Sequence, residues 1–299
     1  MTARTATAEK REILAQLRAA VSQLEGRGAA LEARDGESGP ARGWTFGIPA
    51  LDDHLGGGLA RDGLHEWGLG SGGSSGGQGG PGHGAALAGV VAGLLQRLPD
   101  GADAAGLTRA RARGVLWILS GTVVAEHGRP YGPGLLQAGL DPGDLLFVTV
   151  RRPADVAWAA EEGLKAGRAL KAVVGVGAPL PFAASRRLSL AAGEAGLPCL
   201  WLAMEGRLGG SSAAQTRWRV ASAPGLADPH APRAPGRPVW DLELVRARDA
   251  PPTRFRVVWD DETGGFALAA ALAAGAAATG AEAAVPAAAG QRRTGRRAA

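Results

Sequence analysis

The stretch that most constrains the fold of this 299-residue chain spans residues 44–83 and reads WTFGIPALDDHLGGGLARDGLHEWGLGSGGSSGGQGGPGH. It predicts a short helix over 48–55 that ends at three glycines. The apolar run 64–67 then predicts a strand, which leads into a glycine-rich loop and a further helix marked by apolar residues over 87–98. A strand, a glycine-rich loop and a helix in this order form a junction that can hold phosphate on backbone N–H groups.

The first half of this stretch resembles the start of the ATPase core in the RecA-type recombinase superfamily. In that superfamily the corresponding segment leads into the first core strand and the phosphate loop. The residues that match are Gly47, Leu51, Asp52, Leu55, Gly56, Gly57, Gly58, Leu59 and Gly63. The resemblance implies a RecA-like α/β fold with a mostly parallel sheet flanked by helices.

The second half lacks the chemistry of a phosphate loop. A working loop needs a lysine that reaches the β- and γ-phosphates and a neighbouring Ser or Thr that binds Mg²⁺. The only lysines are Lys10, Lys165 and Lys171, and none is near the loop. Ser75 or His83 could touch an anion, but neither replaces the missing pair, so we expect no bound cofactor and no ATP binding. The degenerate loop region comprises Gly68, Gly70, Ser75, His83 and Gly84.

Two further parts of an ATPase site are missing. Ser120 and Gly121 stand after the second core strand, where a glutamate would activate water, and Glu126 is interpreted as a solvated loop residue. The run 172–177 offers no carboxylate for Mg²⁺. We therefore predict a pseudo-ATPase with no catalytic residues. The pair Asp52-Asp53 is interpreted as charges on a helix side, and the five scattered histidines lack metal-ligand spacing, so no metal site is expected.

Beyond the loop, apolar runs of strand length alternate with helical segments, which predicts a parallel sheet covered on both faces. The strands are predicted at 115–119, 145–150, 172–176 and 199–202, and the helices at 154–169 and 182–195. From residue 216 the pattern has period two, which predicts antiparallel edge strands with one wet face at 217–220, 240–244 and 254–259.

Along these later strands arginine and aromatic residues alternate, so we expect the two types of side chain to point to opposite faces of the sheet. The arginines are Arg217, Arg219, Arg254 and Arg256. Two interpretations stay open. The arginines are either the solvated side of an edge sheet, or a cationic face for a phosphate backbone or an acidic partner.

We expect three parts: an N-terminal amphipathic helix and linker (1–43), a RecA-like core (44–266) and a low-complexity tail rich in Ala, Gly and Arg (267–299). The helix, predicted over 8–31, either folds back on the core or protrudes as an arm that docks on a partner.

The net charge of +5 permits nucleic-acid contact without establishing it. One cysteine excludes an intramolecular disulfide, and no segment is typical of a signal peptide or a membrane span, so we expect a soluble, cytoplasmic protein.

Taken together, the chain resembles the ImuA family, the RecA-like proteins of the bacterial damage-inducible (SOS) mutagenesis cassette. The blocks that carry the resemblance lie within 44–260 and are 47–67, 115–119, 129–148, 153–175, 185–202 and 211–224. The resemblance implies an accessory role, without catalysis, in error-prone translesion DNA synthesis. The implied partners are an ImuB-type inactive Y-family polymerase homologue, an error-prone replicative-type polymerase and RecA, with weak DNA contact and no membrane.

Two other functions stay open at this point. The first is a DNA-dependent ATPase of recombination or repair with a non-standard phosphate site, for which a neighbouring subunit would supply the lysine. The second is a damage-induced regulator of cell division.

Overall fold

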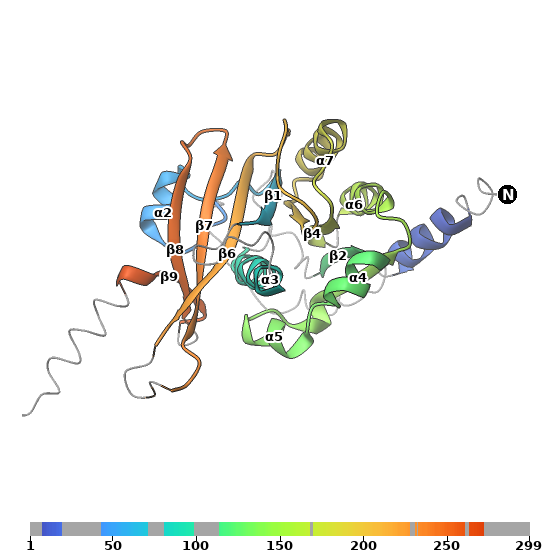
Figure 1. The fold of residues 1–299 in the computed structure, drawn as a ribbon. Helices are drawn as coiled ribbons and strands as arrows, with labels where there is room; N and C mark the ends of the chain where they lie inside the picture. Colours follow the sequence, from blue (N-terminus) through green and yellow to red (C-terminus); the bar gives the residue numbers. More distant parts are fainter. Residues whose placement is uncertain are drawn as a thin grey trace, which may run out of the picture.

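The computed structural model describes residues 8–19, 43–70, 81–98, 114–167, 170–227, 231, 233–260 and 263–271. Within these ranges nine strands form one sheet in the order β3-β2-β4-β5-β1-β6-β7-β8-β9 (Figure 1). Neighbouring strands from β3 to β6 run parallel, and those from β6 to β9 run antiparallel. This RecA-like arrangement confirms the predicted fold class.

The strands of the parallel part of the sheet are β1 (Leu64–Leu69), β2 (Gly114–Ser120), β3 (Leu145–Val150), β4 (Leu170–Gly177), β5 (Cys199–Ala203) and β6 (Thr216–Leu226). Of these, β1, β2, β4 and β5 are almost fully buried, because helices cover both faces there. Cys199 is fully buried at the start of β5, and burial raises the pKa of its thiol to about 12.

The helices divide between two hydrophobic clusters, one on each face of the sheet (Figure 1). On one face lie α2 (Pro49–His54), α3 (Pro81–Gln96), α4 (Gly121–His127) and α5 (Gly132–Gln137). On the other lie α6 (Asp155–Lys165) and α7 (Phe182–Ala195). The 3₁₀ turn η1 (Pro142–Asp144) leads into β3. The sequence pattern did not reveal α4 and α5, which occupy the connection between β2 and β3. No helix in the described ranges combines the length and the apolar character needed to cross a bilayer.

The antiparallel part comprises β7 (Arg237–Ala247), β8 (Thr253–Asp260) and β9 (Gly265–Leu268). The prediction that residues 217–220 form an edge strand was wrong. They belong to β6, which lies inside the sheet between β1 and β7. The sheet also continues past the expected core boundary at 266, because β9 reaches Leu268. Of the predicted tail, residues 272–299 lie outside the described ranges.

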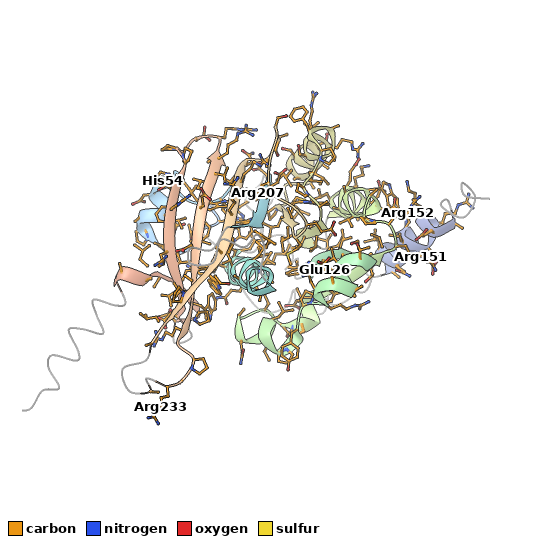
Figure 2. All side chains as sticks on the ribbon, in the orientation of Figure 1. His54, Glu126, Arg151, Arg152, Arg207 and Arg233 are labelled. Carbon is orange, nitrogen blue, oxygen red and sulfur yellow. The ribbon has the colours of Figure 1, made fainter. Side chains whose placement is uncertain are left out.

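The N-terminal helix folds back on its own domain over residues 8–19, the part that the structure describes. Ile13 and Leu17 are buried in the cluster that contains α6. The ammonium of Lys10 lies 5.1 Å from the ring centroid of Trp158, and Arg151 lies beside the helix (Figure 2). Residues 20–31 of the predicted helix are outside the described ranges.

The residues around α2 hold the backbone in a tightly packed conformation, and they do not form a site with two charged side chains. Asp52 is buried, and its carboxylate accepts hydrogen bonds from the backbone N–H groups of Phe46 at 2.7 Å and Gly47 at 2.9 Å. Burial raises the pKa of this carboxyl group, although the backbone N–H groups act in the opposite direction. Gly58 has φ of +111°, and a Cβ there would lie 2.6 Å from the carbonyl oxygen of Trp44. The two aspartates therefore do not act as a pair on one helix side.

Replacing Asp52 with alanine is expected to lower the free energy of unfolding by about 1–3 kcal/mol, because the buried backbone N–H of Phe46 and the partly buried N–H of Gly47 lose their acceptor. Asp53, the next residue, is exposed and provides the matched control. Urea unfolding of both variants measures the difference. An Asp53→Ala variant as unstable as Asp52→Ala would contradict this account.

A chain of three hydrogen bonds runs through the buried side chain of His65. Its Nε2 lies 2.8 Å from the carbonyl oxygen of Ala60, so Nε2 is the donor. Its Nδ1 then accepts from the Thr216 hydroxyl at 2.8 Å, and the Thr216 oxygen accepts from Trp218 Nε1 at 2.9 Å. Burial lowers the pKa of His65 to about 4, so this imidazole is neutral at pH 7.

Candidate functional site

The carboxyl ends of the parallel strands are the usual ligand side of an open α/β sheet. Here they carry no acid among the described strand residues. Strand β2 ends at Ser120, whose hydroxyl accepts a hydrogen bond from Val123 N at 3.2 Å and so caps α4. Strand β4 ends at Val176-Gly177, and β5 at Ala203. These strand ends offer packing and capping groups.

The glycines at the end of β1 are required by packing. A Cβ at Gly68 would lie 2.5 Å from Leu208 Cγ, because the segment after β5 crosses this position. The N–H of Gly70 donates to the carbonyl oxygen of Val220 at 2.7 Å, which continues the pairing with β6. The backbone at both positions is therefore bound within the sheet.

Of the other predicted loop residues, the structure places Gly84. This glycine is in the first turn of α3, where a Cβ would come within 2.8 Å of Met204 Cε. Ser75 and the side chain of His83 lie outside what the structure describes. Anion contact by these two residues stays a prediction.

All three lysines lie in described ranges, and none is at the carboxyl ends of the strands. Lys10 is on the N-terminal helix, and Lys171 is the second residue of β4, at its amino end. Lys165 ends α6 and pairs with Glu161 at 2.9 Å and Glu162 at 3.0 Å.

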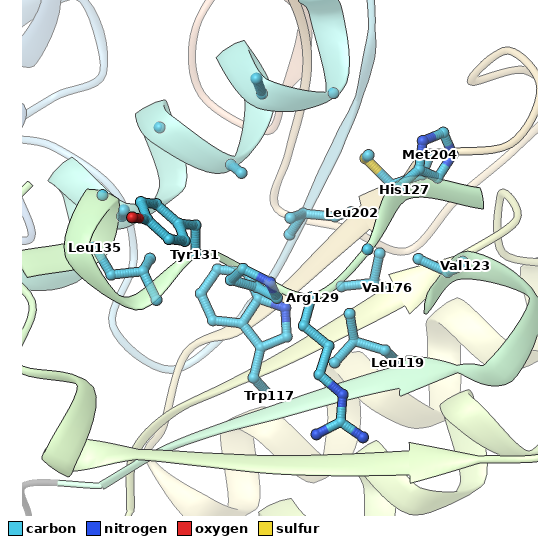
Figure 3. Close-up of a pocket in the computed structure, with 18 of the residues that line it drawn as sticks. Trp117, Leu119, Val123, His127, Arg129, Tyr131, Leu135, Val176, Leu202 and Met204 are labelled. Atoms are coloured by element: carbon cyan, nitrogen blue, oxygen red, sulfur yellow. The ribbon is translucent and has the colours of Figure 1, made fainter. Parts of the chain in front are cut away.

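At the ligand side of the sheet the structure has an apolar cavity of about 490 Å³ between α3 and the α4–α5 segment (Figure 3). Its floor is formed by β2, β4 and β5, and its roof by small residues of α3. The lining residues are Gly84, Ala85, Ala88, Gly89, Ala92, Trp117, Leu119, Val123, Glu126, His127, Gly128, Arg129, Pro130, Tyr131, Gly134, Leu135, Ala138, Val176, Leu202 and Met204. Val176 belongs to the strand from which a Mg²⁺-binding acid is missing.

Trp117 stands at the centre of the cavity floor. Its side chain projects from β2 toward α3 (Figure 3). The residue is only 1% exposed, and its Nε1 is buried without a hydrogen-bond partner. Sequence analysis placed Trp117 only in the apolar run of a strand, and the only signal was one tryptophan in an otherwise aliphatic run.

Polar groups are confined to the rim of this cavity. Glu126 is exposed, as predicted, although it lies on α4 and not in a loop, and its carboxylate is 4.0 Å from His127 Nε2. Arg129 donates to the hydroxyl of Thr149 at 3.2 Å. The side chain of Tyr131 is exposed at the opening.

Three of the four predicted arginines gather on the face of β6–β8, where they line a second hollow of about 580 Å³. Arg219 and Arg254 both contact Glu243, at 3.5 and 2.9 Å. Partial burial opposes the effect, but these two arginines hold the pKa of Glu243 below its usual range. Arg256 binds both carboxylate oxygens of Asp241, at 2.6 and 2.8 Å. Intramolecular acids therefore offset most of the cationic charge of this face.

Arg217, the fourth, is not on the surface, so it does not belong to any exposed cationic row. Its side chain is 8% exposed and forms an ion pair with the fully buried Glu66 at 2.8 Å. It also donates to the carbonyl oxygens of Gly209 and Gly210, and Glu66 accepts from Ser212 at 2.6 Å. The segment after β5 covers this position, and the ion pair holds that segment against the sheet.

Comparison with known proteins identifies the family. No family model matches the chain. Protein ImuA from two strains of Caulobacter vibrioides is 32% identical over 218 residues, which is 70% of this chain and 80% of the relative. The chain belongs to the ImuA family. The sequence resemblance is thereby confirmed over most of the relative's length.

Two solved structures align with parts of this ImuA-family chain. RadB recombinase aligns with a TM-score of 0.46 at 13% identity, over 75% of this chain and 98% of its own. SulA from Pseudomonas aeruginosa aligns with a TM-score of 0.33 at 24% identity, over 47% of this chain and 96% of its own. Scores this low carry no argument about function.

Proposed function

We propose that this ImuA-family chain is a non-catalytic, RecA-like accessory protein of error-prone translesion DNA synthesis in the damage-inducible mutagenesis cassette. Its proposed partners are an ImuB-type inactive Y-family polymerase homologue and an error-prone replicative-type polymerase. Contact with RecA and weak contact with DNA are part of the same proposal. Membership of the ImuA family supports the assignment to this cassette.

The observation that carries the non-catalytic role is the character of the ligand side of the sheet. Phosphoryl transfer depends on cations that hold the phosphates and on a group that orients the nucleophile. Here Trp117, Leu119, Val176 and Leu202 surround an apolar cavity at that position. A triphosphate with its bound Mg²⁺ would lose hydration there, and these four described side chains offer it no charged partner.

The arrangement of the arginines supports a protein partner more than strong DNA binding. Affinity for a phosphate backbone comes mainly from cations that release counterions. On the face of β6–β8, Arg219, Arg254 and Arg256 are already paired with Asp241 and Glu243. Each phosphate contact would have to compete with an intramolecular carboxylate.

The test is nucleotide binding by the purified full chain, measured calorimetrically with ATP and ADP, with and without single-stranded DNA. We expect no binding at millimolar nucleotide and no DNA-stimulated hydrolysis. An active RecA-type ATPase assayed in parallel serves as the positive control. DNA-stimulated turnover above background would contradict the proposal and favour an ATPase with a non-standard phosphate site.

A cellular test separates accessory function from a hidden nucleotide site. In a strain that lacks the gene, the wild-type chain is expected to restore damage-induced mutagenesis. The double variant Ser75→Ala, His83→Ala should restore it equally, because it removes the two polar side chains of the loop region that we predicted could contact an anion. Loss of mutagenesis in the double variant at normal protein level would indicate that the loop has a chemical role.

A further inference from the structure

The positive charge of this chain is concentrated near its C-terminal end. Residues 291–299 read QRRTGRRAA and contain four arginines and no acid. Glu282 is the only acid after residue 271, so the basic segment, residues 272–299, has three more basic than acidic side chains. The described residues contain 21 basic and 18 acidic side chains, which is the same excess over a much longer stretch. The basic segment therefore has the higher density of positive charge.

Many arginines of the described fold are paired with neighbouring acids. Ion pairs of 2.6–3.4 Å join Asp155, Glu161, Glu66, Asp260, Glu243 and Asp241 to Arg152, Arg187, Arg217, Arg237, Arg254 and Arg256, respectively. A phosphate that approached one of these guanidinium groups would also meet the carboxylate beside it, and like charges repel. In the basic segment, by contrast, the nearest acid in the sequence lies ten positions before Arg292.

The basic segment follows the strand at one edge of the sheet. Strand β9 is the last in the strand order and pairs with β8, and the described chain continues from it to residue 271 (Figure 1). Twenty residues, mostly alanine and glycine, separate residue 271 from Arg292. When fully extended, a stretch of this length spans about 70 Å. The four arginines are therefore long enough on their tether to contact a ligand that does not touch the sheet.

The composition of the basic segment favours a phosphate backbone over a lipid surface. Clustered arginines are typical of segments that bind nucleic acid. Helices that bind a lipid surface combine their cations with Trp, Phe or Leu side chains. Residues 273–299 contain none of these three residue types. Arginine also suits phosphate because its planar guanidinium group can donate two hydrogen bonds to one phosphate.

From these observations we propose that the basic segment makes the DNA contact of this protein. Arg292, Arg293, Arg296 and Arg297 bind the phosphate backbone of single-stranded DNA without sequence preference, and the arginine-lined face of β6–β8 takes no part. This inference rests on the proposed function, which includes weak contact with DNA, and it names the segment responsible for that contact.

The test is the salt dependence of single-stranded DNA binding by the full chain. Fluorescence anisotropy of a labelled oligothymidine is measured between 20 and 200 mM salt, as an experimental range of about one decade around physiological strength. For single strands the slope of log K against log salt is about −0.7 per neutralised phosphate, so four contacts give a slope near −3. The tail variant replaces Arg292, Arg293, Arg296 and Arg297 with glutamine. We expect it to bind at least about tenfold more weakly at the lowest salt, with a slope near zero.

A charge-matched control distinguishes this segment from a general effect of net charge. The control variant replaces four exposed arginines of the described surface with glutamine, namely Arg186, Arg207, Arg254 and Arg256. It loses the same four positive charges as the tail variant. We expect its affinity to stay within about twofold of the wild-type value, because these side chains make none of the proposed contacts. Circular dichroism verifies that both variants are folded.

The outcomes separate the inference from the proposed function. Unchanged DNA affinity in the tail variant, or an equal loss in both variants, overturns the inference. So does a tail variant that keeps its DNA affinity and loses binding to the purified polymerase homologue, because the basic segment would then contact protein. If the wild-type chain restores damage-induced mutagenesis but binds no single-stranded DNA at the lowest salt, the inference is overturned and the accessory role remains. A wild-type chain that fails to restore mutagenesis overturns the proposed function instead.

Discussion

Replacing Arg217 with alanine is expected to lower the free energy of unfolding by about 3–5 kcal/mol, because Glu66 would remain as a buried carboxylate without its cation. Glu66 is fully buried, and its other hydrogen bond comes from Ser212. The same change removes two donors from the carbonyl oxygens of Gly209 and Gly210. Guanidinium or urea unfolding monitored by tryptophan fluorescence measures the loss.

Two further variants distinguish a buried ion pair from a general effect of losing an arginine. Arg256→Ala removes an exposed pair with Asp241 and should cost at most about 1 kcal/mol. The double variant Glu66→Met, Arg217→Met replaces both charges with apolar groups and should recover much of the stability, because no buried charge is left alone. If Arg217→Ala were as stable as Arg256→Ala, the ion pair would not be what holds this segment in place.

Acidification from pH 6.5 to pH 4 is expected to remove about 3 kcal/mol of folding stability through His65 alone. The pKa of His65 is about 4 in the folded chain, against 6.5 for the ordinary side chain. Between these two values the unfolded chain binds a proton that the folded chain does not, so stability falls as the pH falls. Below pH 4 both states are protonated, and His65 contributes no further change.

The variant His65→Asn isolates this contribution. An asparagine amide offers one donor and one acceptor group and does not titrate, so the carboxylates are left to determine the acid sensitivity of the variant. Unfolding free energies of both proteins are measured at half-unit intervals of pH. We expect the difference in unfolding free energy between the wild-type chain and His65→Asn to grow as the pH rises from 4 to 6.5. Above pH 6.5 this difference should stay constant. A constant difference at every pH would mean that the pKa of His65 is the same in the folded and the unfolded chain.

Much of the fold could be predicted because the parallel strands are continuous apolar runs. The residues of β2 and β4 are buried on both sides of the sheet, so burial leaves a clear signal in hydrophobicity alone. Helices α4 and α5 were not predicted, because their sequences carry no comparable signal in hydrophobicity. Each is short, and α5 (GPGLLQ) contains two glycines and a proline, which locally favour a turn. Their helical conformation is therefore set by packing against the hydrophobic core beside the cavity.

Side-chain parity predicted which residues share a face, but not what covers that face. Arg217 and Arg219 follow the same alternation along β6, yet Arg217 is buried beneath residues 209–212 and Arg219 remains partly exposed. The difference arises from a connection after β5 that no local pattern encodes. For the same reason, no local pattern could predict that the indole N–H of Trp117 lacks a hydrogen-bond partner. This depends on how the atoms of three separate elements are arranged around it.

The burial of Cys199 has a practical consequence. It is the only cysteine of the chain, and the buried thiol, with its pKa raised to about 12, supplies almost no thiolate to a reagent near neutral pH. Toward maleimide and nitroxide reagents the folded native protein therefore behaves as a cysteine-free background. One sulfur introduced by Leu136→Cys, beside the mouth of the cavity, would provide a single attachment point for distance measurements to a labelled polymerase.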